Sequence, residues 1–270
     1  MDRPAWAPRG IDISVPSVSR IYDYYLGGSH NFEVDRAAAR RAMEFMPGLP
    51  KVMQANRAFL RRAVRFAAAE GIDQFLDIGS GIPTFGNVHE VAQSARPGAR
   101  VVYVDHDPVA VAHSEAVLAG NEDADVVTAD LRKPREILAS PRLRHLIDLN
   151  RPVALLLVAI LHFVEDEDDP YDAVAELRDA LAPGSLLVVT HASYEGIPLP
   201  PERAGGAVDV YRDIRNPLIM RSREDIARFF EGYDMVEPGL VPMPNWRPDP
   251  ASEDEDPYAY SGFAGVGRTA

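Results

Sequence analysis

Buried-strand patterns and helical patterns alternate through the middle of the chain. Short apolar runs predict five strands, at residues 74–78, 100–104, 125–129, 153–158 and 185–190. Segments with apolar residues at helical spacing lie between them, at residues 87–95, 108–119, 133–147 and 171–181. Because buried strands joined by helices form parallel sheets covered on both faces, we expect a doubly wound α/β domain with right-handed crossovers.

The chain before this region has a helical pattern. Three helices are expected, one that starts at Ser17 and stops before Gly27, and two more at residues 34–45 and 52–70. The prolines of residues 1–16 predict an irregular arm. We therefore divide the chain into an N-terminal helical extension, residues 1–70, that packs on the core as a lid, and an α/β domain, residues 71–270.

The pattern becomes less regular after the fifth strand. Residues 194–220 predict a loop with room for one short helix, and residues 223–230 predict a helix that Ser222 caps. Runs at residues 235–241 and 260–266 predict two final strands, joined by a proline-rich acidic loop. Two strands linked in this way suit an antiparallel hairpin on the sheet edge.

The composition is that of a globular domain, with 46% hydrophobic and 26% charged residues. No apolar run approaches the roughly 20 residues that a membrane helix needs, and the N-terminus has no secretory signal. We therefore expect a cytoplasmic location and no membrane partner. The chain has no cysteine, which excludes disulfides and thiolate chemistry.

The formal net charge of -13 argues against a nucleic-acid partner, because phosphate contacts require a basic surface. It favours a small-molecule substrate. Residues 165–169 and 253–256 are acidic runs, but neither has the alternating spacing of a calcium loop. No two histidines have metal-ligand spacing, so we expect no metal. A Gly-x-Ser-x-Gly nucleophile motif is also absent from the sequence.

The loop after the first strand, Asp77 to Gly81, has the features of a cofactor site. Its two glycines allow a ligand to approach the backbone, although the same pattern fits a tight turn between a strand and a helix. Two more carboxylates strengthen the prediction, because Asp105 ends the second strand and Asp130 follows the third. At this sheet edge Asp105 is placed to accept hydrogen bonds from ribose hydroxyls, and Asp130 from an adenine amine.

A nicotinamide dinucleotide is the rival ligand for this loop. Its pyrophosphate prefers a third glycine, where this chain has Thr84, and no adjacent carboxylate. Asp77 instead suits the cationic amino-acid end and the sulfonium of S-adenosylmethionine. Asp107 directly precedes a helix, so it fits a helix cap better than a ligand contact.

The tyrosine-rich segment before the first sheet strand is a candidate lid. We expect residues 17–36 to cover the cofactor and to order on binding, because a methyl-transfer site must exclude water. Tyr22 is the residue expected to contact the cofactor. The alternative is a terminal helix that only packs on the domain.

Arginines and histidines supply the remaining candidates. Arg57 is placed to meet a carboxylate, whereas Arg61, four residues later on the same helix face, suits the solvated surface. His162 follows the fourth strand, where a histidine can remove a proton from an acceptor near neutral pH. His191 ends the fifth strand and is a weaker candidate for the same role.

Several sequence blocks together resemble one known family. They include Arg20 to Gly28, Asn56 to Leu60, Phe75 to Gly79, Gly86 to Glu90, Val102 to Asp105 and Leu161 to Phe163. These blocks are similar to the actinobacterial S-adenosylmethionine-dependent methyltransferases long catalogued as a domain of unknown function. The resemblance implies the class I fold, a seven-stranded sheet in the order 3-2-1-4-5-7-6 whose last strand is antiparallel. It does not identify a methyl acceptor.

The predicted cofactor is S-adenosylmethionine, and the predicted function is methyl transfer to a small molecule, with His162 as the catalytic residue. Two alternatives stay open, a module that binds the cofactor without catalysis and an NAD(P)-dependent oxidoreductase. The residues predicted to bind the cofactor are Asp77, Gly79, Ser80, Gly81, Asp105, His106, Asp130, Leu131, Tyr22 and Arg57.

Overall fold

The computed structural model describes residues 12–84, 86–212, 214, 217–249 and 256–270. Residues 1–11 of the expected irregular arm and residues 253–255 of the second acidic run lie outside this part of the chain. None of the helices within it is long and apolar enough to cross a membrane.

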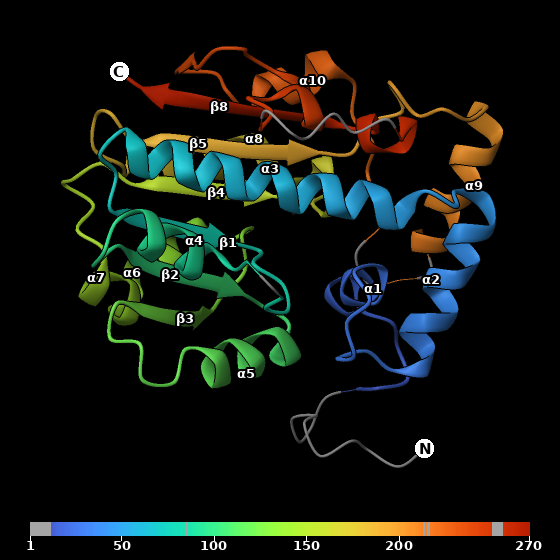
Figure 1. Ribbon diagram of the computed structural model, residues 1–270, viewed down its shortest axis with the longest axis horizontal. Coiled ribbons are helices and arrows are strands. Elements are labelled where there is room, and N and C mark those ends of the chain that lie inside the picture. Colours follow the sequence, from blue (N-terminus) through green and yellow to red (C-terminus); the bar gives the residue numbers. More distant parts are fainter. Residues whose placement is uncertain (1–11, 85, 213, 215–216, 250–255) are drawn as a thin grey trace.

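A mixed sheet forms the centre of the molecule (Figure 1). Its strands are β1 (Gln74–Ile78), β2 (Arg100–Asp105), β3 (Ala124–Thr128), β4 (Ala154–Val158), β5 (Leu186–His191), β6 (Tyr233–Met235), β7 (Val241–Pro242) and β8 (Phe263–Thr269). They follow the order β3-β2-β1-β4-β5-β8-β6, and β7 pairs with β8. The first five strands are parallel, and β8 is antiparallel to β5. This confirms the expected fold class and strand order.

The C-terminal edge of the sheet differs from the prediction in one strand. Residues 235–241 were expected to form a single strand, but the chain turns between β6 and β7. Gly239 N donates to Val236 O at 2.9 Å across this turn, and Gly239 has a left-handed φ of 85°. Pro238 has no N–H to donate to a neighbouring strand, so a continuous strand was the wrong prediction. The sheet therefore has one more short strand than the seven expected.

Helices cover both faces of the sheet, as expected for a doubly wound fold. On one face lie α3 (Leu49–Ala69) and α4 (Val88–Ala95), packed against strand residues that include Phe75 and Val101. On the opposite face lie α6 (Pro134–Ala139), α7 (Pro141–Leu146), α8 (Pro170–Asp179) and α10 (Arg223–Arg228), packed against Leu76 and Val102 among others. Side chains of one strand alternate between these two cores.

The segment 133–147 forms two short helices, α6 and α7, where one was expected. Pro141 has no N–H to continue the first helix, and the Ser140 hydroxyl accepts from Leu143 N at 3.5 Å to start the second. The remaining long helix of this region is α5 (Pro108–Val117), which packs beside β2 and β3.

Three helices lie beyond the carboxyl ends of the parallel strands, and we call them the helical cover. They are α1 (Val18–Tyr25), α2 (Glu33–Phe45) and α9 (Pro201–Arg212), and Figure 1 shows them together at one end of the sheet. The cover has an apolar core of its own, which includes Ile21, Tyr25, Ala39, Ala42, Met46, Ala207, Val210 and Tyr211.

Helix α9 falls in the segment 194–220 that was expected to be mostly loop. Gly205 and Gly206 lower its helix propensity, but Ala207 and Tyr211 bury their side chains against the N-terminal helices. Tertiary packing therefore overrides the local preference.

The division of the chain at residue 70 stays a prediction. Since α3 shares the core of the sheet, the cover is assembled from two segments that are distant in the sequence.

A buried ion pair fixes the start of the cover. Arg20 Nε lies 2.9 Å from Asp35 Oδ2, and both side chains are almost fully buried. The Asp35 carboxylate also accepts from the backbone N–H groups of Ser17 and Phe32, at 2.9 and 2.8 Å. Burial raises the pKa of Asp35, and these hydrogen bonds and the arginine oppose that shift. The pair joins the first turn of α1 to the first turn of α2.

A second buried carboxylate, Asp23, shapes the turn between α1 and α2. It accepts from His30 N at 2.9 Å and from Asn31 Nδ2 at 2.8 Å. Gly28 packs directly on it, since a Cβ at Gly28 would lie 2.0 Å from Asp23 Oδ1. These polar residues of the expected lid therefore hold the backbone of the turn in place.

Replacing Gly28 by alanine should destabilise the protein by roughly 2 kcal/mol, because the added methyl displaces a buried carboxylate that is held by two hydrogen bonds. Thermal or urea unfolding measures this change. Gly205→Ala is the matched control, since a Cβ there meets no atom within 4 Å and alanine favours the helix. An unfolding free energy of Gly28→Ala equal to that of the parent would contradict the steric argument.

Candidate functional site

Two adjoining pockets lie at the carboxyl ends of β1, β2 and β3. The strand-end pocket has a volume of about 710 Å³, and the side pocket has about 330 Å³. Both are lined by Gly79, Asp105, His106, Ile160 and Phe163. Every residue predicted to bind the cofactor lines at least one of them: Asp77, Gly79, Ser80, Gly81, Asp105, His106, Tyr22 and Arg57 in the first, Asp130 and Leu131 in the second.

The glycine loop needs its glycines for two different reasons. Gly79 has a φ of 73°, and a Cβ there would lie 2.4 Å from the Ile160 side chain. Gly81 has a φ of 67°, but a Cβ there would meet no atom within 4 Å. Gly79 therefore packs against protein, whereas Gly81 leaves open space at the pocket. Between them the Ser80 hydroxyl is buried and has no hydrogen-bond partner among the described residues.

Asp77 places a buried carboxylate at the end of β1. Its side chain is 5% exposed, and none of the described donors forms a hydrogen bond with it. Burial raises the pKa of Asp77 to about 7, a shift that Arg57 opposes and Asp105 increases. A carboxylate without donors in an open pocket is suited to a cationic ligand group.

Asp105 is held in place by two backbone amides. Its carboxylate accepts from Gly81 N and from Asp107 N, each at 2.8 Å. Burial raises the pKa of Asp105, and these two hydrogen bonds oppose the shift. Each carboxylate oxygen keeps a lone pair for a further donor, since a carboxylate offers about four acceptor positions.

Asp107 has the role of helix cap that the sequence favoured. Its carboxylate accepts from Val109 N at 2.8 Å in the first turn of α5. It also accepts a hydrogen bond from the Ser17 hydroxyl. Ser17 precedes α1 as expected, but its side chain bonds to Asp107 and does not cap its own helix. This contact ties the cover to the strand ends.

Asp130 is less available than the other two carboxylates. Both of its oxygens accept from the Arg132 guanidinium, and Arg132 lies 3.4 Å from Asp168. Burial raises the pKa of Asp130, but the hydrogen bonds from Arg132 outweigh it and lower the pKa overall. Asp166, which belongs with Asp168 to the acidic run at residues 165–169, pairs with Arg221.

The described part of the chain holds no group of three or more side chains placed to bind a metal ion.

Arg57 carries a donor that no described residue uses. Its Nη2 donates to Gly86 O at 3.2 Å, but its buried Nε has no hydrogen-bond partner in the described structure. Burial raises the pKa of Asp77 and of Tyr22, and the guanidinium lies close enough to each to oppose that shift. This unpaired donor of a positive group and the unpaired Ser80 hydroxyl line the same pocket, and together they are suited to an anionic ligand group.

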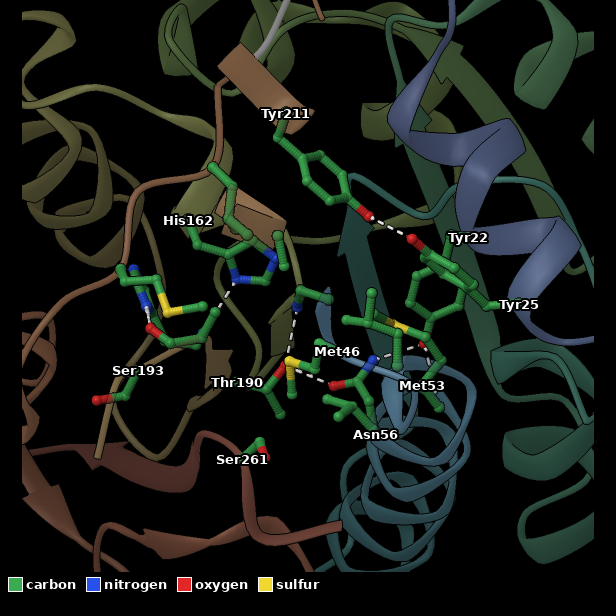
Figure 2. A pocket seen from close by; sticks show the side chains of 18 of the residues that line it. Tyr22, Tyr25, Met46, Met53, Asn56, His162, Thr190, Ser193, Tyr211 and Ser261 are labelled. Atoms are coloured by element: carbon green, nitrogen blue, oxygen red, sulfur yellow. Dashed lines mark hydrogen bonds between the residues drawn. The ribbon is translucent and has the colours of Figure 1, made fainter. Parts of the chain in front are cut away.

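A third pocket, the apolar cavity, adjoins the strand-end pocket and has a volume of about 800 Å³. The two share Val18, Tyr22, Asn56, Ala159 and Phe163 as lining residues. Figure 2 shows the cavity with Tyr22 and Tyr25 on one side and His162 and Ser193 on the other. Its walls come from α1, the first half of α3, the ends of β4 and β5, and the segment that contains α9.

A chain of hydrogen bonds runs along the boundary between the two spaces. Thr190 Oγ1 accepts from Ala159 N at 2.8 Å and donates to Asn56 Oδ1 at 2.7 Å. Asn56 Nδ2 donates to the Tyr22 hydroxyl at 2.8 Å, and that hydroxyl donates to Met53 O at 3.4 Å. Burial raises the pKa of Tyr22. The Tyr22 hydroxyl is therefore neutral and fixed between the pockets.

His162 lies in the short helix Leu161–Phe163 after β4 and lines the apolar cavity. Its Nδ1 accepts from Ala192 N at 3.3 Å. Burial lowers the pKa of His162 well below its usual value, and His191 and Arg221 add to the shift. A neutral ring whose Nδ1 accepts carries its proton on Nε2. His162 therefore offers a hydrogen-bond donor, and not the free lone pair that the expected proton removal requires.

His191 is fully engaged by its neighbours. Its Nδ1 donates to Ala192 O at 2.7 Å, and its Nε2 accepts from Arg221 Nη1 at 2.9 Å. Burial lowers the pKa of His191 to about 3. Arg221 also donates to Leu161 O and Val164 O, both at 3.0 Å. The structure gives His191 a role in holding the ends of β4 and β5, which replaces the expectation of a weaker base.

Sequence reasoning missed several residues that line the apolar cavity, above all Asn56, Thr190 and Ser261. The Ser261 hydroxyl is buried and has no hydrogen-bond partner in the described structure. One signal was present for Asn56, since it interrupts the apolar stripe of α3 between Val52 and Phe59. A polar residue on a buried helix face usually has a specific partner.

Comparison with known proteins places the chain in a family. Residues 4–270 match the family model described as S-adenosyl methyltransferase. A DUF574 family protein from Streptomyces avermitilis is 39% identical, with a TM-score of 0.90 over 96% of this chain and 99% of that one. A putative methyltransferase from Thermobifida fusca is 44% identical, with a TM-score of 0.91 over 98% and 99%. None of the curated proteins is similar enough to count as a match.

These findings agree with the resemblance that the sequence blocks carry. The family model spans nearly the whole chain, and both solved structures are covered almost completely. The predicted cofactor is the one in the family's description. The chain therefore belongs to the S-adenosyl methyltransferase family.

Proposed function

We propose that the protein transfers a methyl group from S-adenosylmethionine to a small molecule bound in the apolar cavity. The observation that carries this proposal is the adjacency of two different spaces. The strand-end pocket holds unpaired charged groups, and the cavity beside it is lined mainly by apolar side chains, as small-molecule sites commonly are. Tyr22 and Asn56 line both, so ligands in the two spaces meet there.

The unpaired groups of the strand-end pocket fit the cofactor one by one. Asp77 is placed for the ammonium group, and Arg57 Nε with the Ser80 hydroxyl for the carboxylate. Asp105 retains lone pairs for ribose hydroxyls, and Asp130 lines the side pocket with Leu131 and Ile160, where an adenine ring would lie. Each group left without a partner by the protein thus has a complementary group on the ligand.

S-adenosylmethionine supplies a methyl group on an electrophilic sulfonium. When bound, it would pass this methyl group to the acceptor's nucleophilic atom, the electron pair of the broken carbon–sulfur bond would remain on sulfur as a thioether, and the acceptor's proton would leave to bulk solvent with the product. The protein supplies positioning and exclusion of water, through the helical cover and the fixed Tyr22 hydroxyl. His162 orients the acceptor by donating from Nε2.

Two other functions have less support from the site. A dinucleotide would place its pyrophosphate beside the buried carboxylate of Asp77, which repels it. A module without catalysis has no need of a second cavity that adjoins the cofactor pocket at Tyr22 and Asn56. Turnover separates this last alternative from the proposal.

The purified protein should bind S-adenosylhomocysteine in a calorimetric titration and should transfer labelled methyl groups from S-adenosylmethionine to compounds in a fractionated extract of small metabolites. Binding without any labelled product would favour the non-catalytic module. Protection in a thermal melt by NADH, without protection by S-adenosylhomocysteine, would contradict the proposal.

Arg57→Leu should weaken binding of S-adenosylhomocysteine about tenfold or more, because a hydrogen bond to a charged group contributes roughly 1.5 to 3 kcal/mol. Arg61→Leu is the control, since Arg61 lies one turn later on α3 and lines neither described pocket of the cofactor site. Titration calorimetry of both variants measures the difference. Equal weakening in the two would show that Arg57 acts only through the overall positive charge of the helix.

Affinity for S-adenosylhomocysteine should rise between about pH 5.5 and pH 8, with a limiting slope of about tenfold per pH unit. The cause is the raised pKa of Asp77, about 7, because the ligand's ammonium group requires the ionised carboxylate and so binding releases a proton. Burial is the main cause of the raised pKa, which Arg57 opposes and Asp105 increases. Asp77→Asn should bind more weakly with a nearly flat profile. An unchanged slope in that variant would assign the proton to another group.

A further inference from the structure

The described residues that line the apolar cavity carry no formal charge. They include no aspartate, glutamate, lysine or arginine. The nearby Arg221 lies behind His191, to which it donates at 2.9 Å, and Asp166 compensates its charge at 2.5 Å. The strand-end pocket on the other side of Tyr22 is different, since Asp77, Arg57 and Asp105 line it.

The ionisable groups of the cavity are also neutral near neutral pH. Burial raises the pKa of Tyr22 and Tyr25 and raises that of Tyr211 to about 12. Burial lowers the pKa of His162, and it lowers that of His191 to about 3. A charge carried into this space by a ligand would therefore lose its hydration without gaining an opposite charge.

Most polar groups of the cavity already bond to one another. Thr190, Asn56 and Tyr22 form the chain of hydrogen bonds described above, and the hydroxyls of Tyr25 and Tyr211 lie 3.2 Å apart. Among the described residues, His162 Nε2–H and the buried Ser261 hydroxyl have no hydrogen-bond partner, and the Ser193 hydroxyl accepts from Glu195 N at 3.2 Å but does not donate. Methionines contribute flexible apolar walls, namely Met46, Met53, Met220 and Met243.

We propose that the methyl acceptor is an uncharged, mainly apolar small molecule that takes hydrogen bonds from His162 and Ser261. This inference rests on the proposed function and narrows it to one class of substrate. The neutral walls admit an apolar body, and His162 and Ser261 orient it. Its reactive atom then lies toward Tyr22, where the cavity and the cofactor pocket meet.

The test uses pairs of probes that share a ring and differ in charge, titrated into protein saturated with S-adenosylhomocysteine. Suitable pairs are naphthol with naphthoate, and the methyl ester of hydroxybenzoate with hydroxybenzoate itself. The neutral member of each pair should bind about tenfold more tightly or better near neutral pH. Carboxylates that bind as tightly as their neutral partners would overturn the proposal, and so would failure of every neutral probe to bind.

Met53→Lys provides the reverse test, because it places one positive charge at the wall of the cavity. It should remove most of the preference for naphthol over naphthoate, whereas the neutral control Met53→Leu should keep it. Binding of S-adenosylhomocysteine is measured alongside in each protein. If the parent does not bind S-adenosylhomocysteine at all, the proposed function is contradicted. If every protein binds it but Met53→Lys keeps the preference for naphthol, only the proposal of an uncharged acceptor is contradicted.

Discussion

The hydrogen bonds that join Ala159, Thr190, Asn56 and Tyr22 hold the two halves of the site in one arrangement. They connect the loop after β4, the end of β5, the long helix α3 and the first helix of the cover. Asn56 and Thr190 are buried, so a broken link leaves polar groups without water or partner. The position of the tyrosine ring between the two pockets therefore depends on every bond in the chain.

The two halves of the site differ in the charge of the side chains that line them. At the strand ends, the buried carboxylate of Asp77 accepts no hydrogen bond and the buried Nε of Arg57 donates none among the described residues. That half of the site is therefore suited to a ligand that carries both a positive and a negative group. In the cavity, the same burial keeps tyrosines and histidines neutral. Tyr22 belongs to both linings, so under the proposed function the zwitterionic cofactor and the apolar acceptor would meet at this residue while each keeps its own environment.

The sheet and its carboxylates were predictable because their causes are local. A strand buried on both faces is a continuous apolar run, so β1 has the bounds expected for it, and consecutive parallel strands put Asp77 and Asp105 at one edge. The cavity was not predictable, because its causes are distant in the chain. Asn56 and Thr190 are 134 residues apart. The proton position on His162 depends on an amide thirty residues away, a relation that no sequence pattern records.

The helical cover is built from two segments of the chain. Only the N-terminal segment lines both the apolar cavity and the strand-end pocket. The chain between β5 and α10 contributes Ala192, Ser193, Ile197, Ala207, Tyr211, Leu218 and Met220 to the apolar cavity, and none of its described residues lines the strand-end or side pocket. Mutations in this segment can therefore accumulate during evolution without disturbing the cofactor contacts. Under the proposed function, changes in this segment would alter the acceptor site and leave the lining of the cofactor site as it is.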